Sequence, residues 1–330
     1  MSYRAFVVNK NGEEFSAGLT ELSESDLPPG DVTIRVEWSS VNYKDGLACS
    51  PTGRILRSYP MVPGVDLAGT VQTSTDARFS EGDPVVVIGY DIGVTHPGGF
   101  AELARVPAGW VVRLPATLST REAMAIGTAG FTAAQSVLAL EGWGLRPEQG
   151  PVIVTGATGG VGSTAVSMLA GRGYRVAGST GKASEGEYLR SLGATEVLTR
   201  EEVSAESNRT METERWAGAV DPVGGATTAY LLRTMRYGSA IALSGMTGGS
   251  NISTTVWPFI LRGVSLMGID SVMLPIGRRQ EIWERLGADL KPRGLLESIA
   301  VETDLDGIGQ AVQAILGGQV RGRTLVRIGA

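Results

Sequence analysis

The sequence predicts an α/β protein of two domains, a β-rich domain and a domain built on a doubly wound parallel sheet. A chain of 330 residues is longer than the roughly 100–200 residues of a typical domain. Residues 3–115 contain short apolar runs separated by Gly and Pro turns, whereas strand-like and helix-like runs alternate from residue 151 onward. Such alternation is typical of parallel βαβ units.

The elements follow in order along the chain. The first region contains the predicted strands 3–9, 31–40, 65–74, 83–90, 99–106 and 109–115. After it, Ser119 and Glu122 have capping-box spacing and precede an Ala/Leu/Met-rich helix. The alternating segments after it are 151–156 with 161–173, 174–180 with 185–193, 196–200, 217–225 with 226–235, 239–245 and 265–270. An amphipathic segment, 278–290, and a strand, 323–330, end the chain and are expected to return to the first domain.

Composition limits the partners that we expect. Hydrophobic residues make up 42% of the chain and charged residues 19%, with a net charge of −5. This balance favours a globular protein that binds small molecules, and it argues against nucleic acid or an anionic membrane. We see no apolar run near the roughly 20 residues that a bilayer span needs and no signal peptide, so we expect a cytoplasmic protein.

The chain has one cysteine, Cys49, and one histidine, His96. A zinc site needs about three or four protein ligands that come largely from Cys and His, so we predict no metal. His96 lies in a Gly/Pro turn, where we expect a surface residue rather than a catalytic one.

A glycine-rich turn, "VTGATGGVG", follows the first apolar strand of the alternating region. Glycines let backbone N–H groups and a helix N-terminus approach a pyrophosphate. The spacing is one residue wider than G-x-G-x-x-G, but the strand, turn, helix and second strand form the βαβ frame that the motif requires. The alternative is a tight turn without a ligand. We predict dinucleotide contacts from Thr158, Gly159, Gly160 and Val161.

The end of the second strand indicates which dinucleotide binds. NAD enzymes usually carry Asp or Glu there for the adenosine ribose, but this chain has Ser179, Thr180, Gly181 and Lys182. Hydroxyl and ammonium groups attract a 2′-phosphate that a carboxylate would repel. We therefore predict NADPH, with Arg200 as a further contact, although Lys182 could also be an ordinary solvated lysine.

The succession "NYKDGLACSPTGR", "YPMVPGVDLAGTV", "GGFAELARV", "GTAGFTAAQSV", "VTGATGGVG", "VDPVGG" and "GRTLVRI" resembles zinc-free medium-chain reductases of the quinone oxidoreductase type. More narrowly, it is similar to the bacterial acrylyl-CoA reductase branch. The resemblance implies a GroES-like catalytic domain, 1–124 with 271–330, around a Rossmann NADP(H)-binding domain, 125–270. It also implies NADPH-dependent reduction of the C=C bond of acryloyl-CoA to propanoyl-CoA. The zinc ligands of related enzymes are replaced here by "NYKD" and "PGVD".

The resemblance and the chemistry together suggest the catalytic residues. Hydride addition to the β-carbon moves charge onto the carbonyl oxygen, which must be stabilised, and a proton then reaches the α-carbon. Tyr43 is the first candidate, as an aromatic face for the cofactor and a phenol donor, and Asn42 is a candidate for positioning. Asp45 could fix this loop or Lys44. The alternative is that "NYKDGL" is only a capped turn into a helix.

Further candidates are weaker. The resemblance implies contacts to the nicotinamide half of the cofactor from Thr128, Leu243, Ile269 and Arg323. A CoA substrate carries phosphates that favour guanidinium groups, and the candidates are Arg54, Arg57, Arg278 and Arg279. The predicted strand 265–270 lies at a sheet edge, which predicts a homodimer. Two alternatives for function remain: a quinone or free-enone reductase, and a non-catalytic NADPH-binding sensor.

Overall fold

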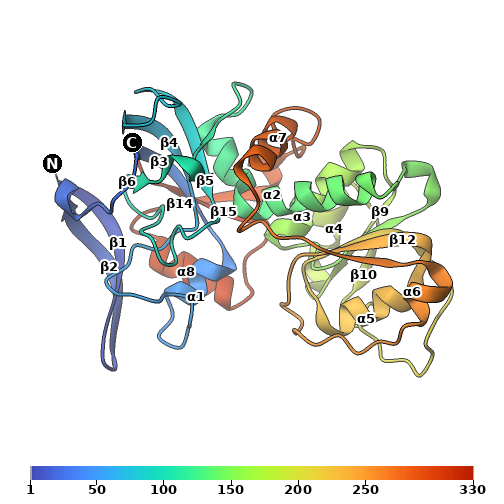
Figure 1. The fold of residues 1–330 in the computed structure, drawn as a ribbon. Coiled ribbons are helices and arrows are strands. Elements are labelled where there is room, and N and C mark those ends of the chain that lie inside the picture. The colour runs from blue at the N-terminus through green and yellow to red at the C-terminus, as the bar shows by residue number, and fades with distance from the viewer. Residues whose placement is uncertain (1, 330) are drawn as a thin grey trace. The chain divides into compact units, whose positions relative to one another are not determined.

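The computed structural model describes residues 2–329, which fold into two compact units (Figure 1). The first unit ends at Thr128 and also takes in Val272–Gly287 and the chain from Ala300 onward. The second unit comprises Ala129–Ser271 and Ala288–Ile299. The predicted boundaries placed all of 271–330 in the first domain, whereas the contacts group 288–299 with the second unit.

The first unit is built on a mixed sheet, in which β14 and β15 pair in parallel and the other neighbouring strands pair antiparallel. One sheet has the order β14-β15-β3-β4-β5-β7, with β6 paired to β3, and β1 and β2 form a separate hairpin. The strands are β1 (Ser2–Asn11), β2 (Glu14–Ser23), β3 (Val32–Val41), β4 (Asp66–Ser74), β5 (Pro84–Ile88), β6 (Leu103–Val106), β7 (Val112–Arg113), β14 (Ala300–Asp304) and β15 (Arg323–Arg327). β15 pairs antiparallel with β3, which joins the C-terminal strand to the N-terminal region.

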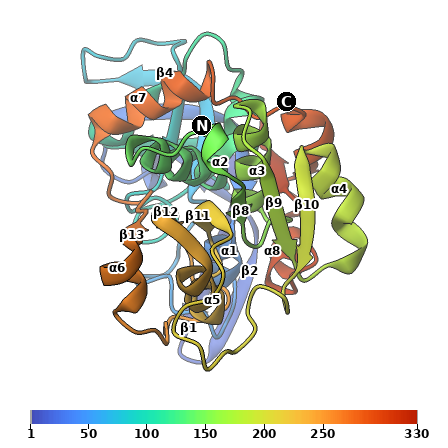
Figure 2. The same ribbon diagram turned by 90° about the vertical axis from the view of Figure 1, so that its right-hand side faces the viewer.

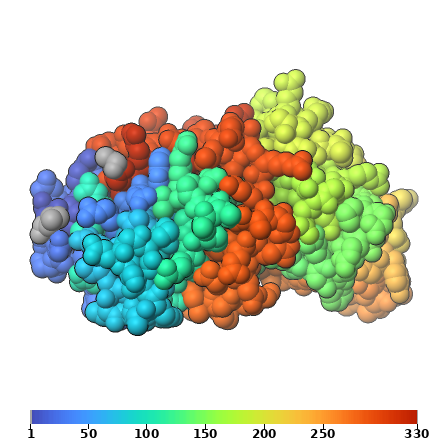
Figure 3. All heavy atoms as spheres, turned by 90° about the horizontal axis from the view of Figure 1, so that it is seen from above, coloured from blue at the N-terminus to red at the C-terminus, as the bar shows by residue number. Residues whose placement is uncertain are grey.

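The core of this unit comes from the inward faces of these strands. Ile34, Val36 and Leu67 are fully buried on β3 and β4, as alternation along half-buried strands requires. The helical elements are α1 (Tyr43–Ala48), α7 (Ile276–Leu286), α8 (Ile308–Leu316) and the 3₁₀ turns η1 (Glu24–Asp26) and η2 (Ala108–Trp110). Figure 3 shows the orange surface of α7 beside the green segment that contains β7, and the two elements are in contact.

The second unit has a six-stranded parallel sheet of order β10-β9-β8-β11-β12-β13. Figure 2 shows β12, β11, β8, β9 and β10 side by side. The strands are β8 (Val152–Val154), β9 (Val176–Thr180), β10 (Ala194–Thr199), β11 (Trp216–Asp221), β12 (Met235–Leu243) and β13 (Ser265–Gly268). The helices are α3 (Gly160–Gly171), α4 (Gly186–Ser191), α5 (Gly225–Thr234) and α6 (Trp257–Arg262), with short helical turns η3 (Pro147–Gln149), η4 (Ala183–Glu185) and η5 (Leu295–Ile299). Helices connect β8 to β9, β9 to β10, β11 to β12 and β12 to β13, whereas a segment without a helix, 200–215, carries the chain from β10 to β11. The doubly wound prediction is confirmed.

Helix α2 (Thr120–Gly142) begins as predicted, with the Ser119 N–H and hydroxyl both donating to the Glu122 carboxylate. Its backbone is broken at Gly127, where φ is 49° and ψ is −162°. By length and composition alone this helix could cross a membrane, although the sequence analysis identified no apolar run of that length. However, 78% of its apolar window is buried inside the protein, as in a core helix.

Candidate active site

The glycine turn between β8 and α3 has the shape that a pyrophosphate site requires. Gly156 has a φ of 53°, and a Cβ on Gly162 would lie 2.3 Å from the Gly156 carbonyl oxygen. The Gly159 N–H donates to that same carbonyl at 3.0 Å. The N-terminal backbone groups of α3 begin at Gly160, and Gly159, Gly160 and Val161 are all partly exposed there. The turn therefore presents N–H groups to an anion.

A cavity of about 400 Å³ lies beside this turn at the carboxyl ends of the parallel strands. It brings together most of the residues predicted for the adenosine end of the dinucleotide: Thr158, Ser179, Thr180, Gly181, Lys182 and Arg200. The Thr158 and Thr180 hydroxyls are 3.0 Å apart, and the Lys182 N–H donates to the Thr180 hydroxyl at 3.0 Å. These bonds fix the end of β9.

The charge of this cavity is positive. A Cβ on Gly181 would lie 2.5 Å from Arg200 Nη2, so the guanidinium lies directly against the Gly181 backbone. Lys182 is the other cation, and no residue that lines the cavity within the described chain is Asp or Glu. This arrangement suits a phosphate monoester better than a pair of ribose hydroxyls.

The opposite wall of the cavity is a glycine-lined contact that the sequence analysis missed. Gly225 has a φ of 58°, and its Cβ would lie 2.6 Å from the Gly248 carbonyl oxygen. The Gly248 N–H donates to the Val223 carbonyl at 2.7 Å. The wall residues Val223, Ala226, Thr227, Thr247 and Gly248 line the cavity, as do Val203 and Ser204 near Arg200. The repeated Gly-Gly pairs in "VDPVGG" and "MTGG" were the available signal.

Buried Asp221 organises this wall. Its carboxylate accepts hydrogen bonds from the hydroxyls of Thr155 at 2.6 Å and Thr228 at 2.5 Å. It also accepts from the N–H groups of Val223 and Gly224. At the neighbouring strand ends, the Ile269 N–H donates to the Leu243 carbonyl at 2.9 Å, so these two backbone groups of the predicted pair already hold each other.

In the first unit, the "NYKD" segment forms the start of α1. Tyr43 is the first helical residue and is 49% exposed. Asp45 is fully buried and accepts hydrogen bonds from the N–H groups of Asn42 at 2.7 Å and Val65 at 3.0 Å. Burial, followed by the nearby Asp66, raises the pKa of Asp45 to about 7. The segment is thus a capped turn, and it also presents a phenol to solvent.

Asp66 is the centre of a buried polar cluster that sequence analysis did not identify. Its carboxylate accepts from the hydroxyls of Ser40 at 2.6 Å and Thr128 at 2.5 Å, from Asn42 Nδ2 at 2.8 Å and from the Thr128 N–H at 3.0 Å. Arg323 Nη2 forms an ion pair with it at 3.3 Å. We call Ser40, Asn42, Asp66, Thr128 and Arg323 the Asp66 cluster.

The cluster changes the expected roles of Asn42 and Arg323. Asn42 is 9% exposed, and its Oδ1 accepts from Arg323 Nη1 at 3.0 Å while its Nδ2 donates to Asp66. Arg323 is 3% exposed, and burial lowers the pKa of its guanidinium. Both side chains are therefore committed to other residues of the first unit. They hold the start of α1 and the break in α2 rather than facing solvent.

The four arginines predicted for CoA phosphates do not share one environment. Arg54 and Arg57 are exposed, and so is Arg278, which is paired with Glu281. Arg279 does not fit the predicted role in phosphate binding, because it is 1% exposed and donates to the carbonyls of Ile88, Val272 and Leu274. Its position in an amphipathic helix turns it inward, where backbone carbonyls satisfy the charge.

The cysteine and the histidine are placed as follows. Cys49 is buried, which with nearby Asp45 raises the pKa of its thiol to about 12. His96 is partly buried rather than on the surface, with Nδ1 3.0 Å from the Pro97 carbonyl and its ring edge against Trp110. Between residues 2 and 329, no three His, Cys, Asp or Glu side chains are grouped to hold a metal. Catalysis without zinc stays a prediction.

Comparison with known proteins assigns the family. Residues 28–116 match the model of the alcohol dehydrogenase GroES-like domain, and residues 160–288 match that of the zinc-binding dehydrogenase. The chain is 50% identical to acrylyl-CoA reductase AcuI of Ruegeria pomeroyi and 49% identical to putative quinone oxidoreductase YhfP of Bacillus subtilis. The first alignment covers 99% of this chain and 100% of the relative, and the second covers 99% of each.

Solved structures agree with these matches. The yhdH oxidoreductase of Salmonella enterica in complex with NADP superposes with a TM-score of 0.96 at 50% identity, covering 99% of this chain and 100% of that one. Bacillus subtilis yhfP with NAD bound superposes with a TM-score of 0.97 at 49% identity, covering 99% of each chain. The predicted GroES-like and Rossmann fold class is confirmed. The chain belongs to the medium-chain dehydrogenase/reductase family, in the group that contains acrylyl-CoA reductases and quinone oxidoreductases.

Proposed function

We propose that this protein is an NADPH-dependent reductase that reduces the C=C bond of acryloyl-CoA, with a hydride and a proton, to give the saturated thioester propanoyl-CoA. The observation that carries the cofactor assignment is the cavity with Lys182 and Arg200 and no carboxylate among its lining residues. The substrate assignment is supported by the relatives named acrylyl-CoA reductase, at 49–50% identity over nearly the whole chain.

The residues of the second unit fit NADPH. The N-terminus of α3 and the glycine turn would hold the pyrophosphate, and Ser179, Thr180, Lys182 and Arg200 would hold the 2′-phosphate. When bound, the cofactor supplies the hydride that reaches the β-carbon of the substrate. Lys182 and Arg200 line the same cavity, which favours phosphate binding over an ordinary solvated role for these two side chains.

The first unit supplies the groups that act on the substrate. The exposed phenol of Tyr43 would donate a hydrogen bond to the thioester oxygen as charge develops there, or a proton to the α-carbon. Asn42 and Arg323 act through position, since their polar atoms hold the Asp66 cluster together. Thr128, whose hydroxyl donates to Asp66, fixes the break in α2 beside them. For the CoA phosphates, exposed Arg54 and Arg57 are the stronger candidates.

The substrate is tested by following NADPH oxidation with acryloyl-CoA, methyl vinyl ketone and a small benzoquinone in turn. We expect the highest kcat/KM for acryloyl-CoA. Turnover with the quinone alone would replace this proposal by quinone reduction, an alternative that the name of the Bacillus subtilis relative favours. Binding of NADPH without any turnover would favour a non-catalytic sensor.

The cofactor is tested by Lys182→Ala. Loss of a charge-assisted phosphate contact is worth about 1.5–3 kcal/mol, so the Kd for NADPH should rise by about tenfold or more. The Kd for NADH should change little, and the exposed lysine variant Lys10→Ala should change neither. Equal losses for NADPH and NADH would refute the 2′-phosphate assignment.

The role of Tyr43 is tested by Tyr43→Phe, which keeps the ring and removes the hydroxyl. If the phenol donates to the substrate, kcat should fall by about 10²–10⁴-fold. An unchanged kcat would leave Tyr43 as an aromatic contact only.

We also propose a homodimer formed through β13. This strand is the edge of the parallel sheet, and the preceding helix α6 exposes Ile260 at 64% and Leu261 at 52%. Light scattering should show a dimer that Ile260→Glu weakens, whereas Val301→Glu, at an exposed position of β14, should leave it intact. A monomeric wild type would contradict this.

We propose a cytoplasmic location, where NADPH and acyl-CoA are available.

A further inference from the structure

A second cavity, of about 250 Å³, lies in the second unit at the opposite end of the parallel sheet from the cofactor cavity. It is lined by Gln149 before β8, by Ala217 at the start of β11 and by residues 236–240 at the start of β12. The cofactor cavity lies at the carboxyl ends of these strands. Nothing in the proposed reaction uses this second cavity.

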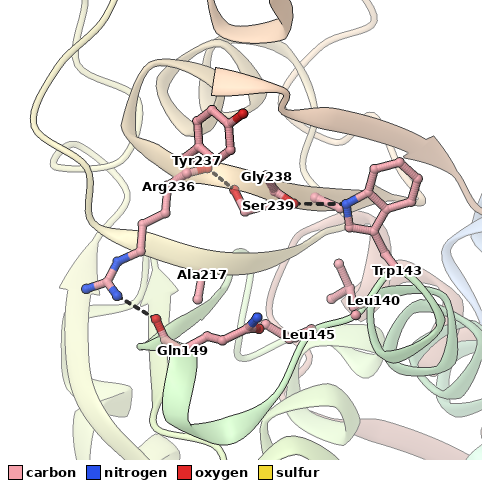
Figure 4. A pocket seen from close by; sticks show the side chains of 11 residues that line it. Leu140, Trp143, Leu145, Gln149, Ala217, Arg236, Tyr237, Gly238 and Ser239 are labelled. Carbon is pink, nitrogen blue, oxygen red and sulfur yellow. Dashed lines mark hydrogen bonds between the residues drawn. The ribbon is translucent and has the colours of Figure 1, made fainter. Parts of the chain in front are cut away.

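The cavity exists because the first residues of β12 bulge away from β11. Met235 pairs with Trp216 and Ala240 pairs with Gly218, so the intervening residues of β12 outnumber those of β11. Bulges of this kind redirect side chains and occur often near functional sites. Here the bulge contains Arg236 and Tyr237, and it opens a space above Ala217 (Figure 4).

Arg236 contributes a positive charge at one side of the cavity, and the Glu214 carboxylate accepts from the N–H of the adjacent Tyr237 at 3.1 Å. It is half-buried, and Nη1 donates to the Gln149 carbonyl at 2.5 Å. A Cβ on Gly150 would lie 2.4 Å from this Nη1, so the guanidinium packs directly on glycine backbone. Throughout residues 2–329, no carboxylate lies within ion-pair distance of Arg236. The guanidinium is thus fixed in place and retains donors for an anion.

Aromatic and aliphatic side chains, together with Ser239 and glycine backbone, form the rest of the cavity. Trp143 Nε1 donates to the Gly238 carbonyl at 3.0 Å, which holds an indole that is still 51% exposed (Figure 4). Tyr237 is 77% exposed at the rim, and buried Leu140 and Leu145 line the interior. Large exposed aromatic side chains around a concave apolar surface are typical of ligand sites.

We propose that this cavity binds a small aromatic carboxylate, with its carboxylate on Arg236 and its ring against Trp143. The volume lies just below the range of about 300–1,000 Å³ that holds drug-sized ligands, so a ligand with a single ring fits best. Because the cavity and the cofactor site occupy opposite ends of the sheet, both can be filled at once. The proposal does not depend on the identity of the enoyl substrate.

Ligand-observed NMR titration with benzoate tests the proposal on the whole protein saturated with NADPH. Benzoate should bind saturably, whereas uncharged benzamide and non-aromatic cyclohexanecarboxylate should each bind at least tenfold more weakly. Arg236→Gln should weaken benzoate binding at least tenfold, and Trp143→Ala should weaken it similarly. Arg35→Gln, at an exposed arginine of the first unit that has no proposed role, should not change it.

Arg236→Lys retains the charge and should retain binding within a few-fold, so it serves if Arg236→Gln fails to fold. Three results would each overturn the proposal: no saturable benzoate binding, an unchanged Kd in Arg236→Gln and Trp143→Ala, or benzoate binding that is at least tenfold tighter without NADPH than in the saturated protein. The last result would assign the binding to the cofactor cavity.

Discussion

Gly127→Ala should destabilise the first unit strongly, because the break in α2 places this residue against the Asp66 cluster. Its φ of 49° with ψ of −162° belongs to a region that is almost restricted to glycine. An added Cβ would lie 2.4 Å from Arg323 Nη2, 2.5 Å from Asp66 Oδ2 and 2.8 Å from the Ser40 hydroxyl. The methyl group therefore cannot enter without separating the buried ion pair.

The expected magnitude follows from these two effects. Backbone strain of this kind costs about 1–3 kcal/mol, and a buried charge that loses its partner costs about 3–5 kcal/mol. Partial relaxation still leaves a loss of at least about 3 kcal/mol. Since 1 kcal/mol shifts the Tm of a unit of this size by about 2–4 °C, the Tm should fall by about 6–12 °C.

Calorimetry of the whole protein measures this change. The matched control is Gly309→Ala in α8, a helical glycine whose added Cβ would meet nothing within 4 Å. That control should stabilise the unit by about 0.5–1 kcal/mol through helix propensity. A Gly127→Ala protein that unfolds within 2 °C of wild type would refute the reasoning that Gly127 is required by the cluster.

Three further predictions follow from buried groups. Folding raises the pKa of Asp45 from 3.8 to about 7, so its contribution to stability falls as the pH rises between these values. In urea unfolding, the free energy of unfolding of Asp45→Asn should therefore increase relative to that of wild type across this pH range. A difference that stays constant with pH would contradict this. Gly162→Ala should raise the Kd for NADPH about tenfold in a fluorescence titration by moving the turn, whereas Gly171→Ala, whose Cβ has 3.7 Å of room, should not. Arg279→Gln should lower the free energy of unfolding in urea by about 2–4 kcal/mol, because it leaves buried carbonyls unpaired. The exposed control Arg278→Gln should lower it by less than about 1 kcal/mol. Equal losses would show that burial does not decide the effect.

The sequence predicted the parallel sheet well because each of its strands is a short apolar run next to a glycine turn or an amphipathic helix. The hairpin strand β2 was missed for the opposite reason. Most of Glu14–Ser23 is exposed, so it carries no apolar alternation that would distinguish a strand from a loop. The available signal was the turn before it, Asn11-Gly12, in which Gly12 has a φ of 61°.

The cofactor residues could be predicted because they are local in sequence. Thr158 and Lys182 are separated by one βαβ unit, and the geometry of that unit brings the ends of β8 and β9 together whatever the rest of the chain does. Arg200 follows at the end of the next strand by the same rule. The wall formed by Gly225 and Gly248 depends on packing between two loops, which no local pattern specifies.

The burial of individual arginines could not be predicted, since a charged side chain is usually exposed. Arg279 and Arg278 are neighbours in sequence, yet one is buried on backbone carbonyls and the other is in solvent. The difference is the helix face, which is set by what α7 packs against. Sequence alone treated the two as equivalent.

Asp66 shows how a residue without any catalytic signature can decide the geometry of a site. It follows an apolar run and lies in "PGVD", a segment from which the sequence analysis inferred only that zinc ligands are absent. Its carboxylate nevertheless joins β3, the cap of α1, the break in α2 and the start of β15, through Ser40, Asn42, Thr128 and Arg323. Asn42 immediately precedes Tyr43, so the orientation of the proposed proton donor depends on this carboxylate. Loss of Asp66 should therefore lower kcat even though its side chain is fully buried and cannot touch the substrate.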